Sequence, residues 1–313
     1  MRVFDVFGLG QCSLDYIGRL GAYPAPGGKT EFSDLTVQGG GPVATALVAL
    51  SRWGLRCAFS GVVGDDEFGR LTLKSLKGEG IHTGGVVVRR GGASQFAFIA
   101  AESPGGRRTV FWQRPSGAPL AKGEVDLAVL GRVKVFHTDG LFIDAALHAA
   151  EKARAAGIPV VVDAGTLRDG MLELARLSDY FIASESFGQV LAGGDDPAGA
   201  CRRIRELGPR LAAVTLGERG YAASFGGTEI RRPAYPVEAV DTTGCGDVFH
   251  AGFIFGLLRE GGPEKSLDLG AWAASRVATG MGGRAGIPPL EEMTARLERP
   301  AREQEGEIHE VKP

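Results

Sequence analysis

The stretch that most constrains this chain is residues 239–256, which read AVDTTGCGDVFHAGFIFG. The first half is small and hydroxylated, and the second half is apolar with Gly and Ala spaced for close packing, which predicts a loop opening into a buried helix. Gly244 and Gly246 can adopt backbone angles closed to other residues, so the N–H groups of Gly244, Cys245 and Gly246 can converge on one point. The helix macrodipole favours negative charge at that point, so the stretch predicts an anion site.

Asp247 falls in the first turn of the predicted helix, where we expect it to stay ionised. An ionised carboxylate beside an anion cradle suits a general base that takes a proton from an attacking hydroxyl, so the pattern indicates phosphoryl transfer. The alternative is that Asp247 only caps the helix and the glycines only form a turn, and a lone Gly-x-Gly-Asp would favour that alternative.

The pattern is longer than a lone Gly-x-Gly-Asp. Asp-Thr-Thr-Gly-x-Gly-Asp followed by Phe249, Ala251, Gly252 and Phe253 resembles the C-terminal signature of the ribokinase-like (PfkB) carbohydrate kinases. The resemblance implies that Asp247 is the catalytic base and that the backbone of residues 244–246 forms the anion hole, with Cys245 where Ala is more usual. It also implies a three-layer, doubly wound α/β fold with a mostly parallel sheet and a small β-sheet lid. ATP with Mg²⁺ would be the donor and a small sugar the acceptor.

Length and composition favour one cytoplasmic domain over residues 1–313. The chain has 313 residues, 44% of them hydrophobic, enough for a full α/β core. A net charge of -2 leaves no excess of Lys and Arg for a nucleic-acid partner. The 4 cysteines form no C-x-x-C pair, which suits a reducing compartment, and no apolar run approaches the ~20 residues that cross a membrane.

Apolar runs alternate with helical stretches along most of the chain. Strand-like segments are residues 3–10, 133–138, 158–163, 179–183 and 211–216, and helical segments include 144–156, 197–207 and 267–281. This order predicts a parallel sheet with helices on both faces. Gly8-Leu9-Gly10 invites a dinucleotide-binding interpretation, but Ser13 replaces the third Gly and the sequence that follows is strand-like, which disfavours a dehydrogenase.

Residues 12–38 and 94–114 have a different, alternating pattern interrupted by Pro and Gly. Residues 94–102 and 107–114 read as a β-hairpin around Ser103-Pro104-Gly105-Gly106. Both blocks look like the lid that covers the sugar in ribokinase-like enzymes. Such a lid exposes a sheet face and edges, which predicts a homodimer formed through it. Residues 299–313 are expected to be a flexible tail.

The predicted sugar-binding residues lie on these segments: Asp15, Lys29, Gly40, Gly41 and Gln113. Asp15 closely follows the first strand, where open α/β sheets gather ligands. Gly39-Gly40-Gly41-Pro42 opens a helix and resembles the N-terminal signature of the family, although Ala44 stands where the family usually has Asn. Lys29 is placed to meet an anionic group on the acceptor.

The predicted nucleotide and ion sites come from three loops. Thr215, Gly217 and Gly220 match the Thr-x-Gly-x-x-Gly turn that lies against the nucleotide in the family, together with Thr243 and Gly244. The resemblance implies a K⁺ site at Asp241 and Thr243, beside the loop of residues 282–288. Ser184-Glu185-Ser186-Phe187 replaces the Asn-x-x-Glu of the family, which leaves Glu185 as a displaced candidate for organising Mg²⁺.

The acceptor stays open at this stage. The Gly-Gly-Gly-Pro segment with Ala44 and the Gly-Gly-Arg-Ala-Gly-Ile-Pro loop look like the sulfofructose kinase branch, but Gln113 and Leu141 stand where further anion-binding groups would be wanted. Ribose, fructose, a keto-deoxy sugar acid and a nucleoside are alternatives. A non-catalytic sugar- or nucleotide-binding protein of the same fold is the rival from another class, and the presence of Asp247 speaks against it.

Overall fold

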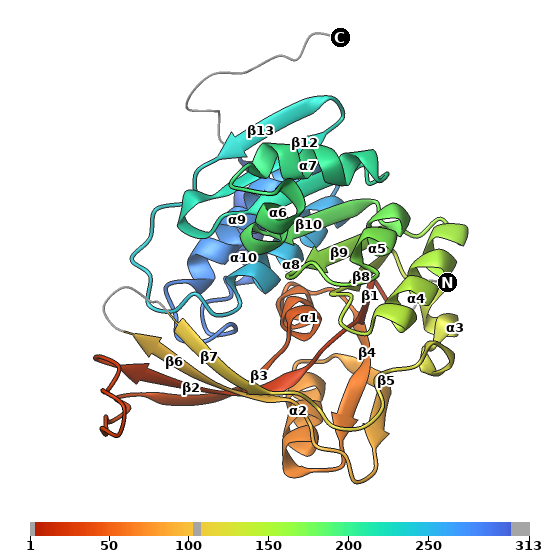
Figure 1. Cartoon of the computed structure of the whole chain (residues 1–313). Helices are drawn as coiled ribbons and strands as arrows, with labels where there is room; N and C mark the ends of the chain where they lie inside the picture. The colour runs from red at the N-terminus through yellow and green to blue at the C-terminus, as the bar shows by residue number, and fades with distance from the viewer. Residues whose placement is uncertain (1–3, 103–107, 302–313) are drawn as a thin grey trace.

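The computed structural model describes residues 4–102 and 108–301, which form two sheets and the helices around them (Figure 1). The larger sheet has nine strands in the order β13-β12-β11-β10-β9-β8-β1-β4-β5, and the smaller has four in the order β3-β2-β6-β7. The predicted fold class is confirmed: a large, mostly parallel sheet covered by helices, with a smaller separate sheet.

The large sheet is parallel from β5 to β11, and its last two pairings, β11 with β12 and β12 with β13, are antiparallel. Its strands are β1 (Val6–Leu9), β4 (Cys57–Gly64), β5 (His82–Arg89), β8 (Val135–Thr138), β9 (Val160–Ala164), β10 (Tyr180–Ser184), β11 (Leu211–Thr215), β12 (Tyr221–Phe225) and β13 (Thr228–Arg232). Because β1 lies between β4 and β8, the connections on its two sides lead in opposite directions, and the carboxyl ends of these strands border a crevice suited to ligands.

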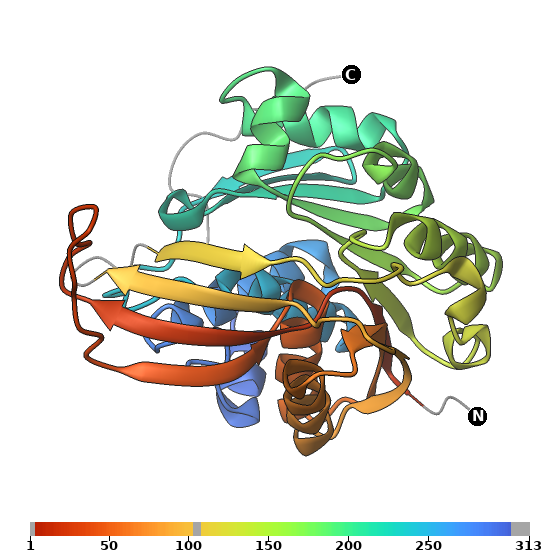
Figure 2. The ribbon, with the colours of Figure 1, turned by 60° about the horizontal axis from the view of Figure 1, so that its bottom comes forward.

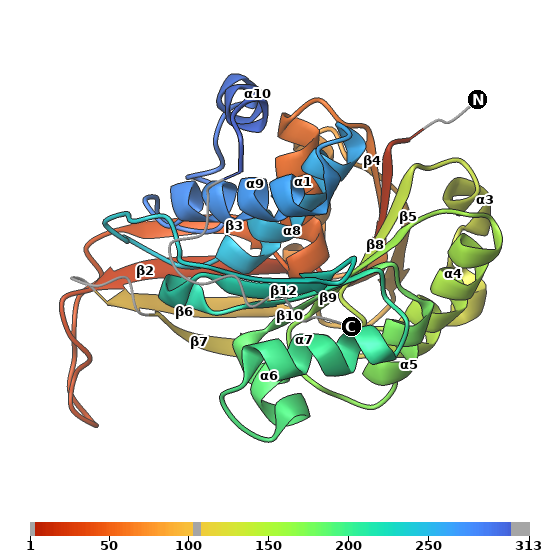
Figure 3. The ribbon, with the colours of Figure 1, turned by 90° about the horizontal axis from the view of Figure 1, so that it is seen from above.

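Both faces of this sheet are buried, which explains why its strands read as continuous apolar runs. One face carries Val161 and packs on α1 (Pro42–Arg52), α8 (Cys245–Leu258) and α9 (Gly262–Val277). The other carries Val162 and packs on α4 (Ile143–Ala155), α5 (Met171–Leu177), α6 (Glu185–Ala192) and α7 (Pro197–Glu206). Figure 3 shows the two helical layers on opposite sides of the strands.

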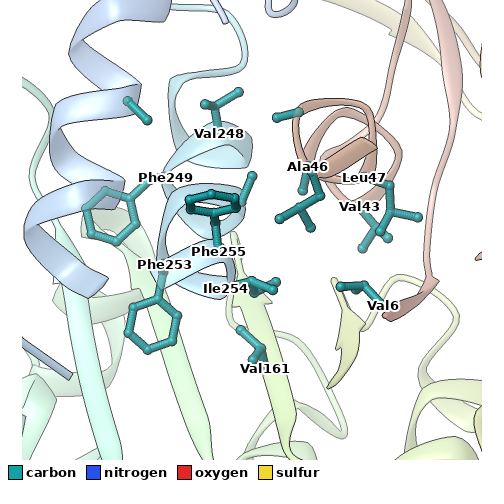
Figure 4. Packing of buried hydrophobic residues seen from close by; sticks show 14 of the residues in the cluster. Val6, Val43, Ala46, Leu47, Val161, Val248, Phe249, Phe253, Ile254 and Phe255 are labelled. Atoms are coloured by element: carbon teal, nitrogen blue, oxygen red, sulfur yellow. The ribbon is translucent and has the colours of Figure 1, made fainter. Parts of the chain in front are cut away.

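Helix α8 is buried over most of its length. Its Phe253 and Phe255 are buried, and Figure 4 shows these rings and Ile254 beside residues of α1 and β9. A Cβ at Gly252 would lie 2.7 Å from the Cα of Gly270, so the glycine allows α8 and α9 to approach backbone to backbone. The spacing of small residues noted in the sequence therefore serves helix packing.

The remaining helices are α2 (Glu67–Gly78), α3 (Leu127–Leu130) and α10 (Leu290–Glu298). The helix predicted over residues 267–281 begins earlier, because Pro263 fits a first turn, and ends at Val277, ahead of a Gly-rich loop. No helix in the part of the chain described is long and apolar enough to span a membrane.

The small sheet contains β3 (Leu35–Gly40), β2 (Ser13–Leu20), β6 (Phe96–Glu102) and β7 (Arg108–Gln113), so both predicted lid segments contribute to it. Figure 2 shows it extending away from the body of the molecule. The predicted turn at residues 103–106 and most of the predicted tail, residues 302–313, lie outside the described residues.

Candidate active site

The loop of residues 241–246 leads into α8 as the sequence predicts. Gly244 is the residue before the helix and has a φ of 76°, a left-handed conformation that glycine adopts without strain. The N–H of Cys245 donates to the carbonyl of Thr242 at 3.4 Å, which closes the turn. The backbone N–H groups at the start of a helix have no partner within it, so Gly246 and Asp247 present donors at this end of α8.

Asp241 holds this loop against the loop that follows α9. Its buried carboxylate accepts from the N–H and hydroxyl of Thr243 at 2.8 and 2.7 Å, and from the N–H of Gly282 at 2.8 Å. The two loops touch so closely that a Cβ at Gly244 would lie 2.4 Å from the Cα of Gly283. Three donors therefore engage the carboxylate that the sequence proposes as a K⁺ ligand.

Beyond Gly283, the same loop reaches the small sheet. A Cβ at Gly39 of β3 would lie 2.7 Å from the guanidinium of Arg284, which is 5% exposed. A Cβ at Gly282 would meet the side chain of Gln38 at 2.4 Å. Residues 282–284 thus connect the loop before α8 to β3, the strand that carries Gly40.

The electrostatic setting of Asp247 differs from the sequence-based expectation. Burial is the largest cause that raises its pKa, followed by repulsion from Asp163; Arg108 opposes the rise, Asp15 and Asp139 add to it, and together these effects bring the pKa to about 8. The expectation that Asp247 stays ionised considered only the helix N-terminus, and the desolvation and the three other carboxylates outweigh that effect. The Asp247 carboxyl is therefore harder to ionise in the folded protein than an exposed aspartate.

Asp139 and Asp163 were not singled out from the sequence. Asp163 lies in β9 on the face that packs on α8, two residues after Val161, and Asp139 directly follows β8. Asp139 accepts from the N–H groups of Gln11 and Leu141 at 2.8 and 2.9 Å, yet burial raises its pKa to about 6. An acidic residue at the carboxyl end of a buried parallel strand is the signal that could have identified both.

Asp15, Gly40 and Gly41 come together at the start of the small sheet. Asp15 is 7% exposed and accepts from the hydroxyl of Ser13 at 2.7 Å. A Cβ at Gly40 would lie 2.0 Å from a carboxylate oxygen of Asp15, and one at Gly41, where φ is 97°, would lie 2.3 Å from the carbonyl oxygen of Gln11. The consecutive glycines are thus required for the Asp15 carboxylate and the neighbouring backbone to fit.

Lys29 and Gln113 are placed apart from this group. Lys29 is exposed in the loop between β2 and β3, past Leu20 and so at the opposite end of β2 from Asp15. Gln113 pairs with Phe96, and strand alternation puts it on the face opposite to the one shared by Asp15 and Ala97. Neither side chain joins Asp15 within one chain.

Arg108 is a member of the site that the sequence analysis did not single out. It projects from β7, and its guanidinium donates to the hydroxyl of Thr242 at 2.6 Å. Its charge lowers the pKa of both Asp247 and Cys245 against the larger effect of burial. This hydrogen bond joins residues far apart in the chain and depends on the docking of the small sheet against the loop before α8. A local sequence pattern does not predict such docking.

A cavity of about 470 Å³ lies beside the N-terminus of α8. It brings the predicted nucleotide residues Thr215, Gly217 and Gly220 together with Thr242 and Gly246. Its further lining, missed from the sequence, comes from the segment before the Asp241 loop and from α9 and includes Tyr235, Pro236, Val237, Ala271, Ala274 and Ser275. The lining of the cavity is mainly apolar.

Glu185 is engaged by protein side chains. Its carboxylate accepts from Arg219 at 2.5 Å and from Gln189 at 3.0 Å, and Arg219 also pairs with Asp195 at 3.2 Å. Within residues 4–102 and 108–301, no cluster of three or more His, Cys, Asp or Glu could hold a metal ion.

The Cys245 thiol is not acidified by the helix N-terminus. Burial raises its pKa to about 12, and the attraction of Arg108 only partly offsets this. Cys245 thus lines the cavity with a thiol that the helix N-terminus does not activate.

Comparisons with known proteins agree with this geometry. Residues 5–290 match the model of the pfkB family carbohydrate kinases. Fructokinase-1 of Oryza sativa subsp. japonica is 32% identical over 231 residues, covering 67% of this chain and 71% of the relative. The 2-dehydro-3-deoxygluconokinase of Thermoproteus tenax is 30% identical over 264 residues, covering 78% of this chain and 80% of the relative.

A solved structure shares the fold over almost the whole chain. Arabidopsis thaliana ribokinase, complexed with ribose and ATP, superposes with a TM-score of 0.79 at 21% identity, covering 95% of this chain and 99% of that one. The sequence match, the two-sheet architecture and the relatives lead to one conclusion: this chain belongs to the PfkB family of carbohydrate kinases.

Proposed function

We propose that this chain transfers the γ-phosphoryl group of MgATP to a hydroxyl of a small sugar or sugar acid, with Asp247 as the general base. The observation that carries the proposal is the position of Asp247: it stands in the first turn of α8, which borders the 470 Å³ cavity, and its carboxylate is near enough to Asp15 for their charges to interact. Nucleotide and acceptor would meet at this carboxylate.

Three groups of residues have separate roles in the proposed reaction. The backbone N–H groups at the start of α8, within residues 244–246, stabilise negative charge on the group being transferred. Asp15 and the backbone at Gly40 and Gly41 orient the acceptor. Asp247 takes the hydroxyl proton, and a carboxyl whose pKa is raised to about 8 is a stronger base than an exposed aspartate.

The cavity residues fit a nucleotide. The apolar wall formed by Ala271, Ala274 and Phe249 suits a base, and Thr215, Gly217 and Gly220 lie at the side where the phosphates would run toward α8. Mg²⁺ usually keeps several waters and binds through substrate phosphates and one or two carboxylates, which agrees with the lack of a protein metal cage. When bound, it would neutralise phosphate charge; Glu185 would have to leave Arg219 to approach it.

K⁺ at Asp241 and Thr243 is part of the proposal. It is supported by the contact between the two loops that the family resemblance implicates. Comparing activity in K⁺ and Na⁺ salts at equal ionic strength tests it.

We also propose a homodimer formed through the small sheet. Leu35 and Val37 of β3 are 60% and 48% exposed, and Phe111 of β7, on the same face of the sheet, is 54% exposed. A second copy would cover these apolar side chains and sheet edges. Sedimentation equilibrium tests it, and the Phe111→Arg variant should shift the protein to monomer.

An ADP-release assay with a panel of acceptors tests the reaction. The panel contains fructose, 2-dehydro-3-deoxygluconate, ribose, sulfofructose and adenosine, with isothermal titration of each acceptor in parallel. ADP release that depends on one acceptor supports the proposal and names the substrate. Binding without turnover in the presence of MgATP would instead indicate a non-catalytic binding protein, and turnover of adenosine alone would indicate a nucleoside kinase.

A further inference from the structure

A side chain of α10 reaches the wall of the cavity beside α8. The guanidinium of Arg296 donates to the carboxylate of Asp268 in α9 and to the hydroxyl oxygen of Tyr235, which lines the cavity. Figure 3 shows α10 outside α9, on the side away from the strands. The match to the family model ends at residue 290, where α10 begins, so Arg296 lies beyond the matched region.

The three side chains form one closed unit. The hydroxyl of Tyr235 donates to the carboxylate of Asp268, whose two oxygens lie 2.9 and 3.0 Å away. The guanidinium of Arg296 also lies over the Tyr235 ring, 5.6 Å from its centroid. The side chains of Asp268 and Arg296 are 3% and 9% exposed, so the ion pair is buried. Because each member is held by the two others, the hydroxyl end of Tyr235 has a fixed position.

The segment that carries Tyr235 depends on such anchors. Residues 233–239 form neither helix nor strand, and they supply much of one wall of the cavity. The segment begins at the end of β13, and just after it the N–H of Val240 donates to the carbonyl of Ala278 at 2.7 Å. Between these two ends, Tyr235 ties the segment to α9 and α10.

The opposite anchor, Asp268, lies on the face of α9 that lines the cavity. Ala271 and Ser275, which line it, follow Asp268 at the i+3 and i+7 positions and so share its side of the helix. A movement of Tyr235 away from Asp268 would therefore separate the wall formed by residues 233–239 from the wall formed by α9. That separation decides how closely the two walls can hold a flat, largely apolar base.

We propose that Arg296 is a positioning residue for the nucleotide: with Asp268, it holds Tyr235 and residues 233–239 against α9 at the spacing that binds the base. Arg296 is absent from the lining of the cavity and acts through Tyr235. The last described helix of the chain thereby sets the affinity for the nucleotide. The inference rests on the proposed binding of ATP in this cavity.

The alternative role of the ion pair is to attach α10 to α9 and nothing more. Helix α10 has an apolar anchor of its own, because Met293 is completely buried in the core. Only the positioning role connects Arg296 to nucleotide affinity through the Tyr235 hydroxyl, so the two roles differ in a measurable way.

Isothermal titration with MgADP tests the proposal without turnover. Tyr235→Phe removes only the hydroxyl and should weaken MgADP binding about fivefold, the factor that corresponds to the net contribution of one hydrogen bond. Arg296→Met should weaken it at least as much, and the double variant should bind no more weakly than Arg296→Met alone. Effects that multiply in the double variant, or an unchanged affinity in either single variant, would refute the proposal.

Two further variants separate the contact from a general loss of packing. Arg205→Met makes the same chemical change on α7, where Arg205 donates to the carbonyl of Pro209, and should leave MgADP affinity unchanged. Arg296→Lys keeps a cation beside Asp268 and should bind MgADP more tightly than Arg296→Met. A Lys variant no better than Met, or an Arg205→Met variant equally weakened, would contradict the assigned role.

Hydrogen exchange in the wild-type protein gives an answer even where a variant does not fold. Saturating MgADP should slow exchange in α10 as well as in residues 233–239, because the bound base braces the unit through Tyr235, and exchange in α4 should not change. Bound MgADP with unchanged exchange in α10 would overturn the role of Arg296 alone. The absence of MgADP binding to the wild-type protein would instead contradict the proposed nucleotide site itself.

Discussion

The Asp247→Asn substitution should abolish turnover and at the same time stabilise the protein. Loss of a general base typically lowers the rate ~10²–10⁴-fold. Sugar affinity should stay within a few-fold, because the carboxylate serves proton removal more than ground-state binding. Stability should rise because Asn removes a carboxyl that the folded state resists ionising.

The magnitude follows from the pKa of Asp247, which rises from 3.8 to about 8 on folding. Each pKa unit corresponds to about 1.4 kcal/mol, so the whole shift would correspond to roughly 6 kcal/mol, and partial solvent exposure reduces the expected effect to about 1–3 kcal/mol. For a chain of this length that gain raises Tm by ~2–6 °C.

The gain should depend on pH in a specific direction. Below pH 3.8 the carboxyl is protonated in both states, so Asn changes little; between 3.8 and about 8 only the unfolded state ionises, so wild-type stability falls as pH rises. Above that range the difference is constant. Thermal denaturation at pH 4, 6 and 8.5 measures it, provided unfolding is reversible.

Asp144→Asn is a matched control. Asp144 is exposed in the first turn of α4, where its charge favours the helix, so its replacement should lower stability slightly, by about 0.3–1 kcal/mol. Equal Tm values for Asp247→Asn and wild type at every pH would refute the assigned electrostatics. Retention of more than about a tenth of wild-type turnover would refute the base assignment.

Three further predictions concern the loop before α8 and the small sheet. Gly244→Ala should destabilise the protein by about 1–3 kcal/mol and reduce kcat, because the φ of Gly244 is 76° and Gly283 leaves no space for a Cβ. The control Gly193→Ala has a φ of 79° but open space around the Cβ, so it should show only the smaller conformational cost. Similar ΔΔG values for the two variants from urea unfolding would contradict this prediction. Iodoacetamide at pH 7.5 should modify Cys245 no faster than it modifies an unactivated buried thiol, because burial raises the pKa of Cys245 to about 12. Mass spectrometry measures the labelling rate. Rapid labelling of Cys245 that MgATP slows would show that the thiol has a lowered pKa, against this prediction. A saturating acceptor should slow hydrogen exchange in β2, β3, β6 and β7 if this sheet closes over the sugar, and unchanged exchange would mean that the sheet is a fixed edge.

The sequence was sufficient for features that depend on local pattern. Buried strands such as β9 and β11 are continuous apolar runs, and Gly244 and Gly246 lie in the turn that their spacing predicts. Features that depend on which strands become neighbours were missed. Asp139 and Asp163 belong to the site only because β8 and β9 are adjacent and both end beneath α8.

The raised pKa of Asp247 shows that electrostatic effects are likewise hard to predict from the sequence. A helix N-terminus can be read from a sequence, but the desolvation and repulsion that dominate here arise where β2, β8, β9 and α8 converge. Arg108 likewise acquires a role through docking of the small sheet, and Lys29 and Gln113 lose proximity to Asp15 through strand direction and alternation.

The contacts of Gly282, Gly283 and Arg284 determine when the site can form during synthesis. The first strands and the Asp15 carboxylate leave the ribosome early, but the loop that braces Asp241 and β3 is made only after every strand of both sheets. Nascent chains therefore cannot assemble the proposed phosphoryl-transfer site when the strands alone have been made. A stalled or truncated product that stops before Gly282 should lack the proposed activity even where its large sheet has folded, so unfinished copies of the protein would not consume ATP.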